Sequence, residues 1–191
     1  GRLERQQAAQ QLVANALGTG DTIFPASAKV QQKAPAKPRH SSSGIIVEGL
    51  DNCMVKFSKC CTPVPGDPVI GFITRGYGVS VHRTDCPNAT PEKQKAEPGR
   101  WVQVSWVDSD QEYYQTSLEI SAKDRDGLAL DVAMALSTQK VKVNNLSARS
   151  QPDGYATVYL VLSVKDKSEL ASVINKLGQI QGVFLVKRAG G

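Results

Sequence analysis

The sequence predicts an α+β protein in which a small β-rich module precedes a mixed domain of strands and helices. Two observations support this class. Short apolar–polar alternations, which are typical of strands, fill residues 45–110, whereas residues 113–191 alternate strand-like with helix-like periodicity. With 191 residues, of which 40% are hydrophobic, the chain suffices for one or two packed cores and is not expected to be disordered throughout.

The stretch before the first module differs from it in composition. Residues 2–17 are rich in Ala, Gln, Leu and Arg, so we expect a helix within 1–20 that ends at two glycines. Residues 21–44 are expected to form a flexible or disordered linker. The reason is that 26–44 combine prolines and a Ser triplet with basic residues and hold no acid.

The β-rich module, 45–110, contains several short strand signals separated by breakers. Strands are predicted for the segments GIIVEGLD, MVKFSK, VIGFITRG, YGVSVHR and WVQVSWV. The cluster CCTPVPGD and the segment TDCPNATPEKQKAEPGR are expected to be turns, the second with a short helix. A module of about 60 residues is only marginally stable unless a cross-link, such as a bound metal, stabilises it.

Four cysteines lie in this module, at 53, 60, 61 and 86. The sequence shows no secretion signal and no apolar run long enough to span a membrane. A cytoplasmic protein with reduced thiols or a metal site is therefore expected, rather than one held by disulfides.

Three of the cysteines and one histidine form a candidate zinc site. Cys60, Cys61, His82 and Cys86 offer three thiols and an imidazole, a set that suits tetrahedral zinc. Adjacent cysteines are unusual ligands because neighbouring side chains diverge, although a turn at Thr62 could direct both inward. The alternative is a pair of small buried apolar side chains beside a hydrogen-bonded histidine. A Cys/His catalytic pair is a further alternative, but nothing in the sequence marks an oxyanion hole.

The second domain, 113–191, is predicted to have the order β-α-β-β-α-β, the ferredoxin-like arrangement. The Pro152-Asp153-Gly154 turn joins two of its strands. Strands are predicted for YQTSLEISA, KVKVNNLSARS, YATVYLVLSVK and GVFLVKRA, and helices for LALDVAMALSTQ and KSELASVINKLGQI.

The corner between the first strand and first helix of this domain is a second candidate site. Gly127 permits a ligand to approach the backbone, and the N–H groups that begin the helix can bind an anion such as a carboxylate. Asn144 and Asn145 on the next strand could hydrogen-bond a polar ligand. The alternative is an ordinary capped turn, with Asp126 close to the N-cap.

Two groups of motifs together resemble a known family. The elements CC-x-P-x-x-GD and G-x-S-x-H-R-x-D-C resemble the zinc-finger, or ribosome-intersubunit, domain of the RelA/SpoT homologues. The segments DRDGLALDV, NNLSARS, DGYATVYLVLSV and GVFLVKR resemble the C-terminal ACT domain of the same family. The resemblance covers about 45–191 and identifies the chain as similar to the C-terminal regulatory region of a (p)ppGpp synthetase/hydrolase.

The resemblance implies a regulatory function without catalysis. In the family the (p)ppGpp synthetase (GTP pyrophosphokinase) and hydrolase domains precede this region, so no catalytic residue is expected here. The family's zinc positions fall on Cys60, Cys61, His82 and Cys86. Branched-chain amino acids (valine, leucine or isoleucine) are implied ligands of the ACT corner. The matching residues there are Asp124, Arg125, Gly127 and Leu128, with Asn144 and Asn145 across from them.

The resemblance also implies partners. In the family this region docks on a stalled ribosome that carries uncharged tRNA, and the ACT domain forms homodimers. The net charge of +5 permits RNA contact without indicating it. Basic residues that flank the cysteine site are expected to face RNA phosphates, the alternative being scattered solubilising charge: Lys56, Lys59, Arg75 and Arg83. A function of another class stays open, a structural dimerisation module without a small-molecule ligand.

Overall fold

A computed structural model describes residues 41–76 and 78–190 of the chain. The helix predicted within 1–20 and nearly all of the predicted linker lie outside the described residues. Within the described part, no helix is both long and apolar enough to cross a membrane.

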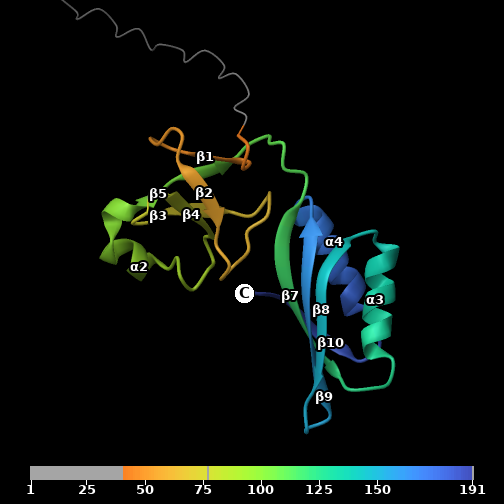
Figure 1. The fold of residues 1–191 in the computed structure, drawn as a ribbon. Coiled ribbons are helices and arrows are strands. Elements are labelled where there is room, and N and C mark those ends of the chain that lie inside the picture. Colours follow the sequence, from red (N-terminus) through yellow and green to blue (C-terminus); the bar gives the residue numbers. More distant parts are fainter. Residues whose placement is uncertain (1–40, 77, 191) are drawn as a thin grey trace, which may run out of the picture. The chain divides into compact units, whose positions relative to one another are not determined.

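The first described module is built from two small sheets (Figure 1). Strand β1 (Ile45–Val47) pairs antiparallel with β6 (Val104–Trp106). The second sheet has the order β2-β4-β3-β5, and only β2 and β4 in it run parallel. Its strands are β2 (Met54–Phe57), β3 (Val69–Ile73), β4 (Gly78–Arg83) and β5 (Trp101–Val102). Helix α2 (Pro91–Ala96) and the 3-10 turn η1 (Pro98–Arg100) connect β4 to β5.

The two sheets of this module pack closely at Gly71 in β3. A Cβ atom built on Gly71 would lie 2.7 Å from Val79 Cγ1 and 2.8 Å from Val104 Cγ1. Any larger residue would push apart the buried valines of β4 and β6, so this position requires glycine. The core around it is small and consists mainly of β-branched side chains: Ile45, Val47, Val79, Val81 and Val104.

The second domain is a four-stranded antiparallel sheet of order β10-β7-β9-β8. In chain order its elements are β7 (Tyr114–Lys123), α3 (Leu128–Thr138), β8 (Lys142–Ser150), β9 (Tyr155–Val164), α4 (Lys167–Gly178) and β10 (Val183–Ala189). Both helices cover the same face of the sheet (Figure 1). The predicted α+β class and the β-α-β-β-α-β order are confirmed.

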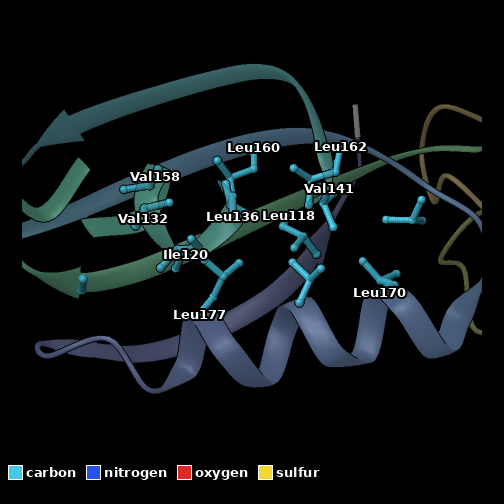
Figure 2. Close-up of a cluster of buried hydrophobic side chains, with 14 of the residues drawn as sticks. Leu118, Ile120, Val132, Leu136, Val141, Val158, Leu160, Leu162, Leu170 and Leu177 are labelled. Carbon is cyan, nitrogen blue, oxygen red and sulfur yellow. The ribbon is translucent and has the colours of Figure 1, made fainter. Parts of the chain in front are cut away.

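Alternation along the strands creates the core of this domain. In β7 every second side chain from Tyr114 to Ala122 is buried, and the intervening ones are at least partly exposed. The side chains of Leu118, Ile120, Leu160 and Leu162 extend from the sheet, and Leu170 and Leu177 of α4 lie beside them (Figure 2). Helix α4 begins at a defined cap, because Asp166 Oδ1 accepts a hydrogen bond of 2.8 Å from the Glu169 N–H.

Candidate functional site

The three cysteines and the histidine of the predicted zinc site meet at one point. Their ligand atoms all lie within 4.8 Å of one another. Cys60 Sγ is 3.4 Å from both His82 Nδ1 and Cys86 Sγ, and Cys61 Sγ is 3.9 Å from His82 Nδ1. Ligand atoms of a tetrahedral zinc site stand about 3.5–3.8 Å apart, given Zn–S of about 2.3 Å and Zn–N of about 2.0 Å. The donor set therefore fits zinc, and the shortest separations, of 3.4–3.9 Å, are close to those of a tetrahedral site.

A tight turn lets the adjacent cysteines converge. After β2 the carbonyl of Ser58 accepts hydrogen bonds from Cys61 N at 3.5 Å and Thr62 N at 2.9 Å, so the chain curls back on itself. Thr62 has a φ of 41°, in the left-handed region, and Pro63 follows it. The divergence expected for neighbours in a strand does not arise here, because Cys60 and Cys61 lie in a turn and not in a strand.

Hydrogen bonds hold each sulfur in place. Ser58 Oγ lies 3.1 Å from Cys60 Sγ, the Arg83 N–H donates to Cys61 Sγ at 3.3 Å, and the Asn88 N–H donates to Cys86 Sγ at 3.4 Å. Such donors favour thiolates, which are the form that binds a metal.

Burial opposes the charged form of these ligands when no cation is bound. It raises the pKa of the Cys61 thiol to about 12 and raises that of Cys86. Burial also acts to raise the pKa of Cys60, but hydrogen bonds from Asn88 and Ser58 outweigh it and lower the value. Burial lowers the pKa of His82, which keeps its imidazole neutral. A divalent cation would supply the missing charge and displace the thiol protons, so metal binding would release protons.

Cys53 is not part of this cluster. Its side chain is half-buried against the valine core of the first module, as expected for a small apolar residue. All four cysteines are free thiols.

The corner of the second domain forms a cavity of about 560 Å³. Asp124, Arg125, Gly127 and Leu128 line it, together with Ala148, Ser150 and Ala156. Gly127 has a φ of 79° and precedes the first residue of α3. The Arg125 guanidinium is engaged locally: it donates to Asp131 Oδ2 at 2.5 Å and to the Gln181 carbonyl at 3.1 Å.

The structure does not bring Asn144 and Asn145 into this cavity. They lie at the beginning of β8, whereas the cavity is lined by Ala148 and Ser150 near its end. Asn144 instead donates a hydrogen bond of 2.8 Å to Ser163 Oγ on β9. The reason is their distance along the strand: several residues separate Asn144 and Asn145 from the cavity-lining end of β8, and each residue advances the chain by about 3.3 Å.

The four basic residues expected to face RNA differ in availability. Lys56, Lys59 and Arg75 are exposed, on β2, beside the cysteine turn and in the β3–β4 turn respectively. Arg83 instead binds Asp85 through two hydrogen bonds of 2.8 and 2.5 Å, and only 17% of its side chain is exposed. Its charge is therefore largely neutralised.

Sequence reasoning missed a second group of residues beside the cysteine cluster. A cavity of about 570 Å³ is lined by Phe72, Trp101 and Lys93 as well as by Lys59, Cys60 and His82. The sequence does show aromatic residues within predicted strands of this module, but the pairing of β3 with β5 that brings them together is not visible in it.

Comparison with known proteins identifies both modules. The family model of the RelA/SpoT RIS domain matches residues 45–107, and that of the ACT domain matches residues 110–188. The chain is 34% identical to a GTP pyrophosphokinase of Streptomyces antibioticus, over 98% of this chain and 22% of that protein. It is 38% identical to the bifunctional (p)ppGpp synthase/hydrolase RelA of Mycobacterium tuberculosis, over 81% of this chain and 21% of that protein.

These relatives are much longer than the chain, which spans about a fifth of their length. Among solved structures, the ACT domain from GTP pyrophosphokinase of Chlorobium tepidum is 25% identical over 40% of this chain and 97% of its own, with a TM-score of 0.37. The chain therefore belongs to the RelA/SpoT family and represents its C-terminal regulatory region, a RIS domain followed by an ACT domain.

Proposed function

We propose that this region reports amino-acid supply to the (p)ppGpp synthetase and hydrolase domains of a longer parent protein, and that it is itself catalytically silent. The RIS domain docks on ribosomal RNA of a stalled ribosome with uncharged tRNA, in the cytoplasm. The ACT domain binds a branched-chain amino acid. The observation that carries this proposal is the succession of the two regulatory domains, each with a candidate site built from its own elements.

Zinc would act as a structural staple in the RIS domain. Cys60, Cys61, His82 and Cys86 supply four protein ligands, and a site closed in this way is typical of structural zinc and not of catalysis. The bound metal would fix the turn after β2 against β4, which a module with so small a core needs.

The ACT cavity suits a small aliphatic amino acid. The N-terminus of α3 and Gly127 present backbone N–H groups for a carboxylate, while Leu128, Ala148 and Ala156 form an apolar wall for the side chain. Asn144 and Asn145 do not belong to this proposal, since they do not line the cavity.

RNA docking rests on the exposed cations of the RIS domain. Lys56, Lys59 and Arg75 are available to phosphates, whereas Arg83 is committed to Asp85. We expect the chain to sediment with ribosomes that carry uncharged tRNA, and this binding should weaken as salt rises. Failure to sediment with such ribosomes at low salt would contradict the docking proposal.

Calorimetry tests the amino-acid proposal. Valine, leucine and isoleucine should give saturable heats, and Ala148→Phe should abolish them by filling the cavity. Ala133→Phe, on the exposed side of α3, is the matched control and should bind normally.

The runner-up is a dimerisation module without a ligand. It is favoured by β8, which forms an edge of the sheet and whose residues are all exposed apart from the half-buried Leu146. An exposed edge strand of this kind can pair with a strand of a second chain. A stable dimer in sedimentation, with no heat from any of the three amino acids, would establish it over the amino-acid sensor.

A further inference from the structure

The cavity beside the cysteine cluster, here called the Trp101 cavity, is lined mostly by residues that are not candidate zinc ligands. It is lined by Phe72 and Trp101 from neighbouring strands, by Lys59 and Lys93, and by Ser58 and Asn88. Its volume of about 570 Å³ lies within the range of small-molecule sites, roughly 300–1,000 Å³.

The aromatic wall of the Trp101 cavity is held rigidly. Phe72 and Trp101 are register partners on β3 and β5, and their ring centroids lie 4.8 Å apart at an interplanar angle of 55°. The Arg100 guanidinium carbon lies 4.2 Å from the centre of the Phe72 ring and fixes that ring further. The His82 ring, which also lines the cavity, lies 6.1 Å from that of Trp101.

The mouth of the Trp101 cavity is positively charged. Lys59 and Lys93 are both exposed, and Lys93 Nζ is oriented by a 2.8 Å hydrogen bond to Asn88 Oδ1. Glu97, the acid in the lining, is paired with Arg100 at 2.7 Å. The free charge at the mouth is therefore cationic.

We propose that the Trp101 cavity binds one unpaired nucleobase of RNA. The base lies against the Trp101 and Phe72 side chains, while Lys59 and Lys93 contact the flanking phosphates. An aromatic wall with adjacent cations is what single-stranded RNA recognition requires, because every base has a face that stacks and every linkage carries a charge. This inference rests on the proposed RNA docking of the RIS domain and assigns it a specific contact, distinct from Lys56 and Arg75.

Trp101 itself provides the first readout. The chain contains two tryptophans, and Trp106 lies elsewhere, stacked on Phe57 and bonded through Nε1 to the Asp67 carbonyl. In a Trp106→Phe variant the fluorescence of Trp101 can be followed alone. A ten-nucleotide oligoadenylate, whose bases are unpaired, should quench it saturably, whereas a fully paired RNA duplex of the same length should not.

Substitution of Trp101 provides the second readout, by anisotropy of labelled oligoadenylate. Trp101→Leu should weaken binding about tenfold, since stacking on an aromatic side chain contributes on the order of 1–3 kcal/mol per base. Trp101→Phe is the matched control and should bind nearly as wild type. Trp101 Nε1 has no hydrogen-bond partner among the described residues, so this change breaks no hydrogen bond. Equal zinc content and circular dichroism would show that both variants are folded.

Salt dependence separates the base from the phosphates. Lys59→Gln and Lys93→Gln should each lower the slope of log affinity against log salt by about 0.7. Trp101→Leu should lower the affinity and leave the slope unchanged, because stacking releases no counterions.

Three outcomes would overturn the base contact. Suppose that oligoadenylate binds, but that it does not change Trp101 fluorescence and that the Trp101→Leu variant binds it as tightly as wild type. RNA docking is then supported, and the base contact in the Trp101 cavity is refuted. If adenosine monophosphate quenches Trp101 as tightly as the oligomer does, the ligand is a free nucleotide and not RNA. If neither oligoadenylate nor ribosomes bind, the proposed docking and the pocket fall together.

Discussion

Arg188, near the end of the last strand, contacts the loop that follows Cys60 and Cys61. Its Nη1 atom lies 2.8 and 2.7 Å from the two carboxylate oxygens of Asp67, and its Nη2 donates to the Thr62 carbonyl at 2.5 Å. The Asp67 carboxylate also accepts a hydrogen bond of 2.9 Å from the Val64 N–H. This ion pair is mostly buried, with 14% of the Arg188 side chain and 3% of that of Asp67 exposed.

Loss of this arginine should cost stability. We predict that Arg188→Met lowers the free energy of unfolding by about 3 kcal/mol, because it leaves a buried carboxylate without its cation. Lys187→Met is the control: it breaks the pair with Glu119 at 3.0 Å, but the lysine side chain is 52% exposed, so a change within about 1 kcal/mol is expected. Urea denaturation measures both, and equal losses would contradict the prediction.

The candidate zinc ligands give a second prediction for single residues. The purified chain should contain one zinc per molecule by elemental analysis, and Cys61→Ser should lose most of it, because three remaining ligands leave the site open. Cys53→Ala should keep the metal, since Cys53 lies outside the cluster. A metal-free chain that is fully folded with reactive thiols would refute the site.

Among the elements, α4 depends on its first turn. Asp166 caps the Glu169 N–H, and Glu169 Oε2 in turn accepts a hydrogen bond of 2.6 Å from the Lys165 N–H. This reciprocal arrangement resembles a capping box: it satisfies one backbone donor in the first turn of the helix and one in the residue before the N-cap.

Removing the cap should be measurable. Asp166→Ala is predicted to lower the free energy of unfolding by about 1 kcal/mol. Ser168→Ala, two residues along on the exposed surface, should change it by less than about 0.5 kcal/mol. Urea denaturation of the two variants provides the comparison, and a neutral Asp166→Ala would show that packing alone sets the beginning of α4.

Periodicity explains which elements the sequence could predict. The alternation of β7, the apolar face of α4 and the turn at Pro152 are local signals, and each of these elements was predicted. The segment 101–107 was predicted as a single strand, but it divides into β5 and β6, which pair with different sheets. Strand pairing over long separations has no local signature, so this division could not be foreseen.

The same distinction holds for the candidate sites. Cys60, Cys61, His82 and Cys86 were recognisable because ligand chemistry is carried by residue type, even though the turn that joins the adjacent cysteines was not. Asn144 and Asn145 were placed beside the ACT corner because they lie on the next strand. The register of β8 on β9, which carries them away from it, depends on tertiary packing.

At the scale of the whole molecule, the loop 62–67 belongs to both domains. Val64 is fully buried in the core of the ACT domain, although it follows Cys61 of the candidate zinc site by only three residues. The Pro65 carbonyl accepts a hydrogen bond of 2.8 Å from Lys167 N, at the start of α4, and Thr62 Oγ1 lies 3.1 Å from Thr116 Oγ1 on β7. The cysteine cluster and the ACT core are thus linked through a few residues.

Cooperative unfolding should follow from this link. We predict a single calorimetric transition, with equal calorimetric and van't Hoff enthalpies, whose midpoint falls as a whole when zinc is chelated. Two transitions, of which only one responds to the chelator, would mean that the loop does not couple the domains.

The position of Val64 bears on how the chain can be dissected. A piece cut at the boundary between the two family matches, near residue 110, would retain every strand and helix of the ACT fold. It would nevertheless lack Val64, whose side chain fills part of the core, and Arg188 would lose its partner, the Asp67 carboxylate. We therefore expect a fragment cut at the family boundary to be less stable and more prone to aggregate. A fragment that also includes residues 57–68 should be more stable.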